Sequence, residues 1–357
     1  MPGVNVVGDH APFRLRSLEP GDGPAIAALL AASPDTGTVR MRLEYKIDPY
    51  VAFTYGGHDL GVVVESDRVE GLAGMGMVRL GEAMIRGERR PLGFLYALMV
   101  HPACRRQGMA RAIAERRVAL ATERLGADAV IMATIQQGNT GSFANARAWS
   151  SQLSRPLIML PMPMRKSPPS GAAAGRVRPA GPKDLAAFAG GSNDFHDHFD
   201  LWSPADEESL AGWLAASPVS DPVRKLWVIE DAAGNLLAGL GTSESRRVST
   251  EYIDHMPVGM RALNLVLRIV PRSGSVDYVA VSKLWFKSGN ESAARTLFET
   301  VRWEMRTLGE GVACTFDPEG PTARMVRRSR LQMTGRMRLA IRSQAEIRPD
   351  WFLDPSE

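Results

Sequence analysis

The sequence predicts an α+β protein made of two successive domains of similar design, each a mostly antiparallel, twisted sheet flanked by helices. Three observations lead to this prediction. The chain has 357 residues, about twice the usual size of one domain. A segment poor in core-forming residues divides it near the middle. Several residues also recur on both sides of that segment at one fixed offset, which indicates an internal duplication.

The dividing segment runs from Arg165 to Pro182 and is rich in Pro, Gly, Ala and Ser, a composition that supports little regular structure. We therefore expect one domain at 1–165, a linker at 166–175 and a second domain at 176–357. The recurring residues lie 162 positions apart (176 minus 14). They are Arg14, Arg16, Pro20 and Asp22 in the first copy, and Arg176, Arg178, Pro182 and Asp184 in the second.

Composition limits the possible classes of protein. The apolar fraction is 45%, the charged fraction is 23%, and no apolar run reaches the length of a membrane span. The N-terminus lacks the pattern of a signal or transit peptide, and Cys104 and Cys314 are the two cysteines, so we expect a cytoplasmic protein without disulfides. Residues 321–342 carry seven arginines and no acid. They form either a solvated face or the surroundings of a phosphate-bearing cofactor, and we expect neither nucleic acid nor membrane as partner.

In the first domain we expect a strand at 13–16, helices at 21–32 and 38–50, and strands at 60–65, 69–80, 84–86 and 92–100. A helix from Met109, a strand from Ala129 and a helix near Ser142 follow. The second domain repeats this order, with a hairpin formed by strands at 226–230 and 236–243.

Two amphipathic helices occupy the same place in the two domains. Their apolar positions follow the helical period, and each helix ends in Leu-Gly, at Gly126 or Gly309, where glycine would form a left-handed cap. These positions are Ala110, Ala114, Val118, Ala121 and Leu125 in the first helix, and Ala294, Leu297, Val301, Met305 and Leu308 in the second.

The stretch from Gly93 to Leu120 leads a strand through a short basic turn into the first of these helices. The first helical turn offers unpaired N–H groups and the positive end of the helix dipole, which together suit a pyrophosphate. Gly108 lacks the Cβ that would block a close approach, and Ala110 keeps the helix near the sheet. The positive charges come from Arg105, Arg106 and Arg111.

The pattern V-x-P-x-x-R-x-x-G-x-A, formed by Val100, Pro102, Arg105, Gly108 and Ala110, resembles the acetyl-CoA loop of the GNAT superfamily. The resemblance implies two tandem GNAT-type domains, each with a splayed central strand pair. It also implies acetyl-CoA, or another acyl-CoA, as the cofactor of the first domain. The residues that would bind it are Leu98, Met99, Val100, Arg105, Arg106, Gln107, Gly108, Met109, Ala110, Arg111 and Asn139.

The implied activity is acyl-CoA-dependent N-acyltransfer, in which a neutral amine of a small molecule attacks the thioester directly. Tandem members of the superfamily include mycothiol synthases and acyltransferases of β-lactam clusters such as that for clavulanic acid, so the resemblance extends to antibiotic biosynthesis. Two alternatives stay open. The first domain's ligand is structural or sensed while transfer occurs in the second domain, or the whole protein is a non-catalytic binding module. We expect a monomer or a homodimer.

The sequence departs from the family pattern at two places. Ala146 stands where many members have a tyrosine that protonates the leaving thiolate. In the second copy, Ser288 lies opposite Arg105 and Glu291 opposite Gly108, so we expect weaker cofactor binding there, because an acidic residue repels a pyrophosphate.

Several other residues are weaker candidates. Tyr96 either faces the thioester as a catalytic residue or belongs to the core, and Glu70 and Glu82 are possible bases. The cluster DFHDHFD from Asp194 to Asp200 has ligand types for a metal, but its spacing favours local ion pairs, so we expect no metal.

Overall fold

The computed structural model describes residues 13–33, 40–169, 175–267, 274–326 and 334–354. We call the described residues up to 169 the first half and those from 175 the second half. The helices of the first half are α1 (Gly23–Ala32), α2 (Pro49–Thr54), α3 (Met109–Leu125) and α4 (Thr140–Ala146). Its strands are β1 (Arg14–Ser17), β2 (Arg40–Tyr45), β3 (Asp59–Glu65), β4 (Leu72–Ile85), β5 (Glu88–Val100), β6 (Val130–Gln136), β7 (Gln152–Leu153) and β8 (Leu157–Pro163).

The second half repeats much of this order. Its helices are α5 (Leu185–Phe195), α6 (Glu207–Ala215), α7 (Val258–Leu267), α8 (Glu291–Glu304) and α9 (Pro321–Met325). Its strands are β9 (Arg176–Pro179), β10 (Phe199–Asp200), β11 (Arg224–Glu230), β12 (Leu236–Glu244), β13 (Ser249–His255), β14 (Ser275–Val276), β15 (Tyr278–Phe286), β16 (Gly311–Phe316), β17 (Gly335–Arg342) and β18 (Phe352–Leu353). The predicted hairpin is present as β11 and β12, which pair antiparallel.

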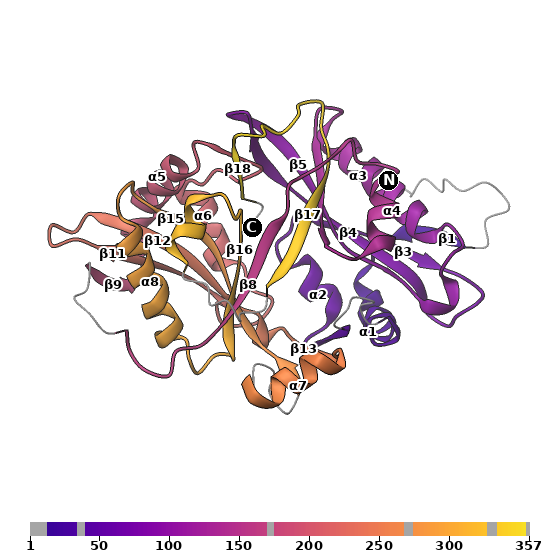
Figure 1. Ribbon diagram of the computed structural model, residues 1–357. Coiled ribbons are helices and arrows are strands. Elements are labelled where there is room, and N and C mark those ends of the chain that lie inside the picture. Colours follow the sequence, from indigo (N-terminus) through magenta and orange to yellow (C-terminus); the bar gives the residue numbers. More distant parts are fainter. Residues whose placement is uncertain (1–12, 34–39, 170–174, 268–273, 327–333, 355–357) are drawn as a thin grey trace.

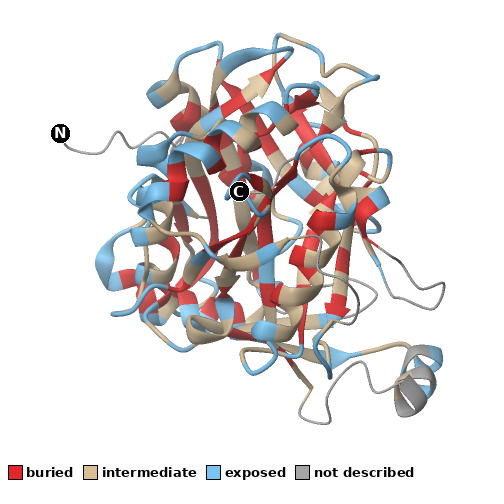
Figure 2. Cartoon of the chain, turned by 90° about the vertical axis from the view of Figure 1, so that its left-hand side faces the viewer, coloured by how far each residue is buried: buried red, intermediate tan, exposed pale blue. Residues whose placement is uncertain are grey.

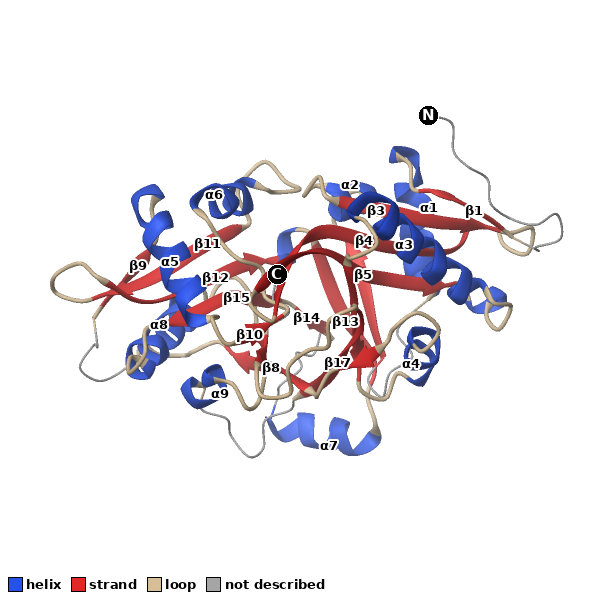
Figure 3. Ribbon diagram, turned by 90° about the horizontal axis from the view of Figure 1, so that it is seen from above, coloured by secondary structure: helices blue, strands red, loops and turns tan. Residues whose placement is uncertain are grey.

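A single 13-stranded sheet runs through both halves. Its main order is β1-β3-β4-β5-β6-β17-β8-β16-β15-β12-β11-β9, and β7 pairs with β17 beside this path. The halves exchange strands at its centre, because β17 of the second half pairs with β6 and β8 of the first half pairs with β16. Figure 1 shows β8 and β17 side by side where the halves meet. Most strand pairs are antiparallel and helices flank the sheet (Figure 3), so the predicted α+β class is confirmed.

The division into domains at 166–175 stays a prediction, and residues 170–174 of the expected linker lie outside the described residues. Among the described residues, no helix is both long and apolar enough to cross a membrane.

Each half contains one parallel strand pair that diverges. Strand β5 pairs with β6 over Leu92–Phe94 and no further, and β15 pairs with β16 over Tyr278–Val281. The predicted splayed central pair is therefore present in both halves. A bulge accompanies each divergence: Ala97 in β5 has φ 49° and Lys283 in β15 has φ 51°, values that side chains other than glycine rarely adopt.

The main cores lie between the sheet and the two long helices. Helix α3 packs on β3, β4 and β5 through its buried apolar face, and α8 packs on β11, β12 and β15. Figure 2 shows buried residues concentrated along the strands and on the helix faces that meet them. In α3 these residues include Ile113, Ala114, Val118 and Ala121, and in α8 they include Ala294, Leu297 and Val301.

An arginine beside an aspartate is repeated at the start of both halves. Arg16 binds Asp22 at 2.7 Å, and Arg178 binds Asp184 at 2.7 Å. The hydrogen bond from Arg178 lowers the pKa of Asp184 to about 2 from a usual 3.8. Because this carboxyl is more acidic in the folded chain, its contribution to stability is present above about pH 4 and is lost as the pH falls toward 2.

Two local predictions are wrong. Within the expected helix at 38–50, residues 40–45 form strand β2, because alternating charged and apolar residues allow it to pair with β13 of the second half. Gly309 is not a left-handed cap: α8 already ends at Glu304, and Gly309 instead lies close to the backbone of Asp277. The strands expected at 69–80 and 84–86 are one continuous strand, β4.

Asp317 joins the two halves at a buried ion pair. Its carboxylate is 0% exposed and forms an ion pair with the guanidinium of Arg155 of the first half, at 2.7 Å between nitrogen and oxygen. It also accepts a hydrogen bond from the N–H of Leu353 at 3.0 Å. Since removal of one partner leaves a buried group unpaired, D317A should lower the free energy of unfolding by about 3 kcal/mol, measured as a shift of the urea midpoint.

The matched control is E319A. Glu319 also faces Arg155, at 3.5 Å, but its side chain is 70% exposed. Exposed pairs contribute little, so this variant should unfold near the wild-type midpoint. Equal shifts for the two variants would contradict the assigned role of Asp317.

Candidate functional site

A pocket of about 1090 Å³ lies beside the diverging end of β5 and is built by both halves. Its floor is the last part of β5, where β6 no longer pairs. From the first half it is lined by α1, β2, α2, the loop before α3 and helix α4. From the second half it is lined by Val223, Ser243, Glu244, Ser245, Val248 and Ser249.

The basic loop forms one end of the pocket. After β5 ends at Val100, a short 3-10 turn leads to Arg106, with φ 62°, and to Gly108, with φ 78°, directly before α3. A Cβ placed on Gly108 would meet no heavy atom within 4 Å, so the space in front of the helix N-terminus is open. Arg105 returns toward the strand and donates from Nε to the carbonyl oxygen of Val100 at 3.2 Å. This end combines positive charge with free helix N–H groups.

All but one of the predicted cofactor-binding residues line this pocket. The exception is Gln107, whose side-chain amide lies 3.5 Å from the carbonyl oxygen of Ala103 and thus turns back into the loop. The lining residues are Leu98, Met99, Val100, Arg105, Arg106, Gly108, Met109, Ala110, Arg111 and Asn139. Their role as ligand contacts stays a prediction.

Asn139 lies at the N-terminus of α4, close after β6. Its Oδ1 accepts a hydrogen bond from the N–H of Ser142 at 3.0 Å, which caps the helix. The cap fixes the position of the side chain at the edge of the pocket. The same helix ends with Ala146, which is buried.

Tyr96 lines the pocket and also packs on Phe53 and Phe94, so it has core contacts, while its catalytic role stays a prediction. Its hydroxyl donates to Oδ1 of Asp59 at 2.7 Å, and the same oxygen accepts from Nε of Arg79 at 3.0 Å. Burial, and then the negative charge of Asp59, raise the pKa of Tyr96. The phenol therefore stays protonated, with its proton directed at Asp59.

Arg117 is a residue that sequence reasoning missed. It is 3% exposed, and its guanidinium donates to the carbonyl oxygens of Met77 at 3.1 Å and Tyr96 at 2.9 Å, beside the bulge of β5. Burial lowers its pKa to about 10. Gly76 makes room for it, because a Cβ there would lie 2.8 Å from Nε of Arg117. The available signal was a basic residue on the apolar stripe of α3, four positions after Ile113.

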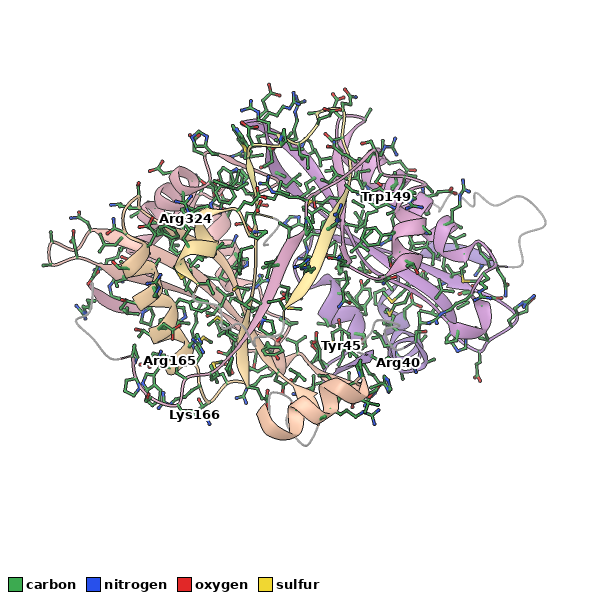
Figure 4. The ribbon with its side chains drawn as sticks, in the orientation of Figure 1. Arg40, Tyr45, Trp149, Arg165, Lys166 and Arg324 are labelled. Atoms are coloured by element: carbon green, nitrogen blue, oxygen red, sulfur yellow. The ribbon has the colours of Figure 1, made fainter. Side chains whose placement is uncertain are left out.

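Sequence reasoning also missed the pocket wall that the second half contributes, and no local sequence pattern predicts it. Strand β13 pairs with β2 of the first half, with Ser249 opposite Tyr45. Figure 4 labels Tyr45 at the bottom centre, where the halves approach each other. A further link is the guanidinium of Arg224, which donates to the hydroxyl of Tyr55 at 2.6 Å. These contacts between the halves form the second-half wall of the pocket.

The corresponding place in the second half is filled by the chain itself. Where β15 and β16 diverge, a cavity of only about 20 Å³ remains, and Phe199 and Leu353 line it. They belong to β10 and β18, which pair with each other. The loop before the helix is also shorter there: residues 287–290 separate β15 from α8, whereas 101–108 separate β5 from α3. Ser288 lies in this short loop, and Glu291 is the first residue of α8.

The remaining candidates do not reach the pocket. His196 is buried and binds Oδ2 of Asp354 at 2.8 Å, so it anchors the C-terminal segment. Glu82 is exposed and pairs with Arg89, and Glu70 is exposed as well. Within the described ranges, no group of three or more His, Cys, Asp or Glu side chains is placed to hold a metal. Arg324, from the arginine-rich segment, lies in the second half far from Tyr45 (Figure 4), while Arg327, Arg328 and Arg330 fall outside the described residues.

Residues 32–147, which contain the basic loop, match the acetyltransferase (GNAT) family. This part of the chain is therefore similar to GNAT acetyltransferase domains. No curated protein matches the sequence.

Solved structures with the same fold include Saccharomyces cerevisiae N-myristoyltransferase with bound myristoyl-CoA, at a TM-score of 0.64 and 12% identity over 98% of this chain and 88% of that one. The GCN5-related N-acetyltransferase from Kribbella flavida has a TM-score of 0.52 and 15% identity over 92% of this chain and 71% of its own. That from Anabaena variabilis has a TM-score of 0.50 and 12% identity, with coverages of 92% and 72%. The TM-scores show a shared fold.

The position of Arg117 in this part of the chain leads to a structural prediction. R117M removes both hydrogen bonds at the bulge, so the backbone from Ala97 to Val100 should open more readily. We expect amide hydrogen exchange in this segment to accelerate roughly tenfold or more, equal to ~1.4 kcal/mol of local opening, with β11 and β12 unchanged.

R116M is the matched control, because Arg116 is the neighbouring residue on α3 and its charged end pairs with Glu123 at the surface. Exchange in β5 should stay at the wild-type rate in this variant. Wild-type exchange in R117M would show that the bulge holds without the guanidinium.

Proposed function

We propose that the protein is an acyl-CoA-dependent N-acyltransferase that uses the pocket at the end of β5 for its donor. The observation that carries this proposal is the joint presence, in one pocket, of the splayed β5 and the basic loop before α3. The GNAT family match over residues 32–147 and the N-acyltransferase folds of the structural neighbours support it.

The donor's pyrophosphate would lie against the loop, where helix N–H groups and the side chains of Arg105, Arg106 and Arg111 supply positive charge. The open space at Gly108 fits a phosphate that approaches the backbone closely. Its pantetheine arm would run along Leu98 to Val100, whose edge toward β6 is unpaired beyond Phe94. The residues present therefore fit an acyl-CoA.

The inner part of the pocket is apolar and leaves room for the acyl group and the acceptor. Leu30, Met41, Leu43 and Phe53 line it, contributed by α1, β2 and α2. An acetyl group needs little of this space, and the bound myristoyl-CoA of the yeast N-myristoyltransferase supports the view that this fold can hold a larger chain. The donor is thus acetyl-CoA or a longer acyl-CoA.

We place one donor site in each chain, in the first half. The second half is a related copy whose own splay is packed with side chains, and it serves as the wall of the acceptor space. The tandem arrangement supports a relation to acyltransferases of antibiotic biosynthesis and to mycothiol synthases. The acceptor would then be the amine of a small molecule, and the protein would act in the cytoplasm.

The residues accelerate transfer mainly by position. Holding amine and thioester together supplies the entropic part of the rate, and a backbone N–H near the end of β5 can stabilise the oxyanion. Cys104 is fully buried beside the loop, and direct attack by the amine requires no acyl-enzyme. The alternative function is a sensor that binds acyl-CoA without turnover. The presence of alanine instead of tyrosine at position 146 supports this alternative.

Release of CoA from acetyl-CoA and longer acyl-CoAs, measured with a panel of small amines, separates these functions. An acyltransferase releases CoA only when a suitable amine is present. G108E should abolish this release and weaken acyl-CoA binding by at least about tenfold, because its carboxylate would occupy the phosphate space and repel the ligand. No release with any amine, despite tight binding, would favour the sensor.

G87E is the matched control for G108E. Gly87 has the same φ of 78° and the same open space around its Cβ, but it lies in the turn between β4 and β5, away from the pocket. Backbone strain should therefore be equal in the two variants. If G87E lost acyl-CoA binding to the same extent, strain and not the phosphate site would explain the effect.

A further inference from the structure

The charges that line the pocket are unevenly distributed. Arg105, Arg106 and Arg111 belong to the basic loop of the first half. Arg111 itself pairs with Glu115 at 2.7 Å. Two other arginines are also engaged with carboxylates, since Arg42 pairs with Glu44 at 3.0 Å and Arg79 with Asp59 at 3.0 Å. Among the described residues that line the pocket, Glu244 is the only acidic one, and it comes from the second half.

The surroundings of Glu244 leave its carboxylate short of partners. It is the last residue of β12 and its side chain is 8% exposed. Its ion-pair partner, Nζ of Lys225, is 3.9 Å from Oε1, which is beyond hydrogen-bond distance, and the Lys225 side chain is half exposed. Within the described part of the chain, the carboxylate accepts no hydrogen bond. Its oxygens are not among the buried polar atoms that lack a partner, and Glu244 lines the pocket, so a ligand or water there can satisfy the charge.

Glu244 is also held at a defined place relative to the first half. Its N–H donates to the carbonyl oxygen of Val223 at 2.8 Å, and the next residue, Arg224, reaches Tyr55 on α2. Val223 and Tyr55 both line the same pocket. The carboxylate therefore belongs to the wall that faces the acceptor space, whereas the phosphate end belongs to the first half.

We propose that Glu244 binds the ammonium group of the acceptor and takes its proton, so that the acceptor is a basic alkylamine. This proposal rests on the proposed acyltransferase function. One proton passes from the ammonium to the carboxylate, and the neutral nitrogen then bonds to the thioester carbonyl carbon. The carbon–sulfur bond breaks, the second proton ends on the departing sulfur of CoA, and Glu244 releases its own proton to solvent.

The other carboxylates near the pocket suit this role less well. Oδ1 of Asp59 already accepts from Tyr96 and Arg79, and its side chain is 2% exposed. Glu82 lies outside the pocket and is paired with Arg89. With Glu244 as the base, the second half takes part in the reaction although the opening between its own strands β15 and β16 is filled by side chains.

The test compares E244Q with E82Q, which removes a carboxylate of the first half outside the pocket. One substrate is the alkylamine that gives the fastest CoA release with the wild-type protein. The other is its analogue with a trifluoromethyl group on the carbon that bears the nitrogen, which is mostly neutral at pH 7. E244Q should lower kcat/KM for the basic amine by about 10²-fold or more. The fluorinated amine should lose less than about tenfold, since it needs no proton acceptor before attack. E82Q should match the wild type with both.

Binding of acetyl-CoA to E244Q should remain at the wild-type affinity, which shows that the variant is folded. With E244A, added formate should restore part of the rate, as expected for a missing base and not for a missing structural contact. Wild-type turnover by E244Q, or equal losses with both amines, would overturn the assignment of Glu244 alone. If none of the amines tested caused the wild-type protein to release CoA, the acyltransferase function itself would be contradicted.

Discussion

Two hydrogen bonds from Arg117 are the interaction on which the pocket depends. They bind carbonyl oxygens of β4 and β5 beneath the bulge at Ala97, and they bring a guanidinium into the core although a buried charge is costly to desolvate. Gly76 lets α3 come close enough to make them. The bulge directs β5 away from β6, and the pocket occupies the resulting opening. The buried guanidinium of Arg117 thus lies where β5 separates from β6. The basic loop follows at the end of β5.

The two halves share this scheme and use it differently. Position 117 lies eight residues into α3, and the residue eight positions into α8 is Glu299, which pairs with Arg165 and Arg302 and not with the sheet. The bulge of β15 persists without a buried arginine, and the opening beyond it is packed by Phe199 and Leu353. Because β8 and β17 are exchanged, the filled half is joined to the open one within a single sheet. It can then serve as a wall for a pocket that the first half alone would leave unbounded.

The sequence was most informative where the chemistry is local. The spacing from Val100 to Ala110 predicted the loop, and all but Gln107 of the predicted contacts line one pocket, because a strand, a turn and a helix N-terminus are specified by adjacent residues. The helix predicted over residues 40–45 is wrong although their alternation fits a strand, since the partner that stabilises this strand lies far along the chain in β13, with Ser249 opposite Tyr45. The exchanged strands and the position of Glu244 depend on pairing between distant segments, and periodicity within one segment carries no information about it.

The central claim is that the opening beside β5 is a pocket for acyl-CoA, and that the corresponding opening beside β15 is closed by the protein's own side chains. Native mass spectrometry of the wild-type chain, titrated with acetyl-CoA, measures this directly. The account predicts that binding saturates at one acetyl-CoA for each chain, with no second molecule bound at a several-fold excess of ligand. Two molecules bound with similar affinity would contradict it, because the second would require Phe199 and Leu353 to leave the space between β15 and β16.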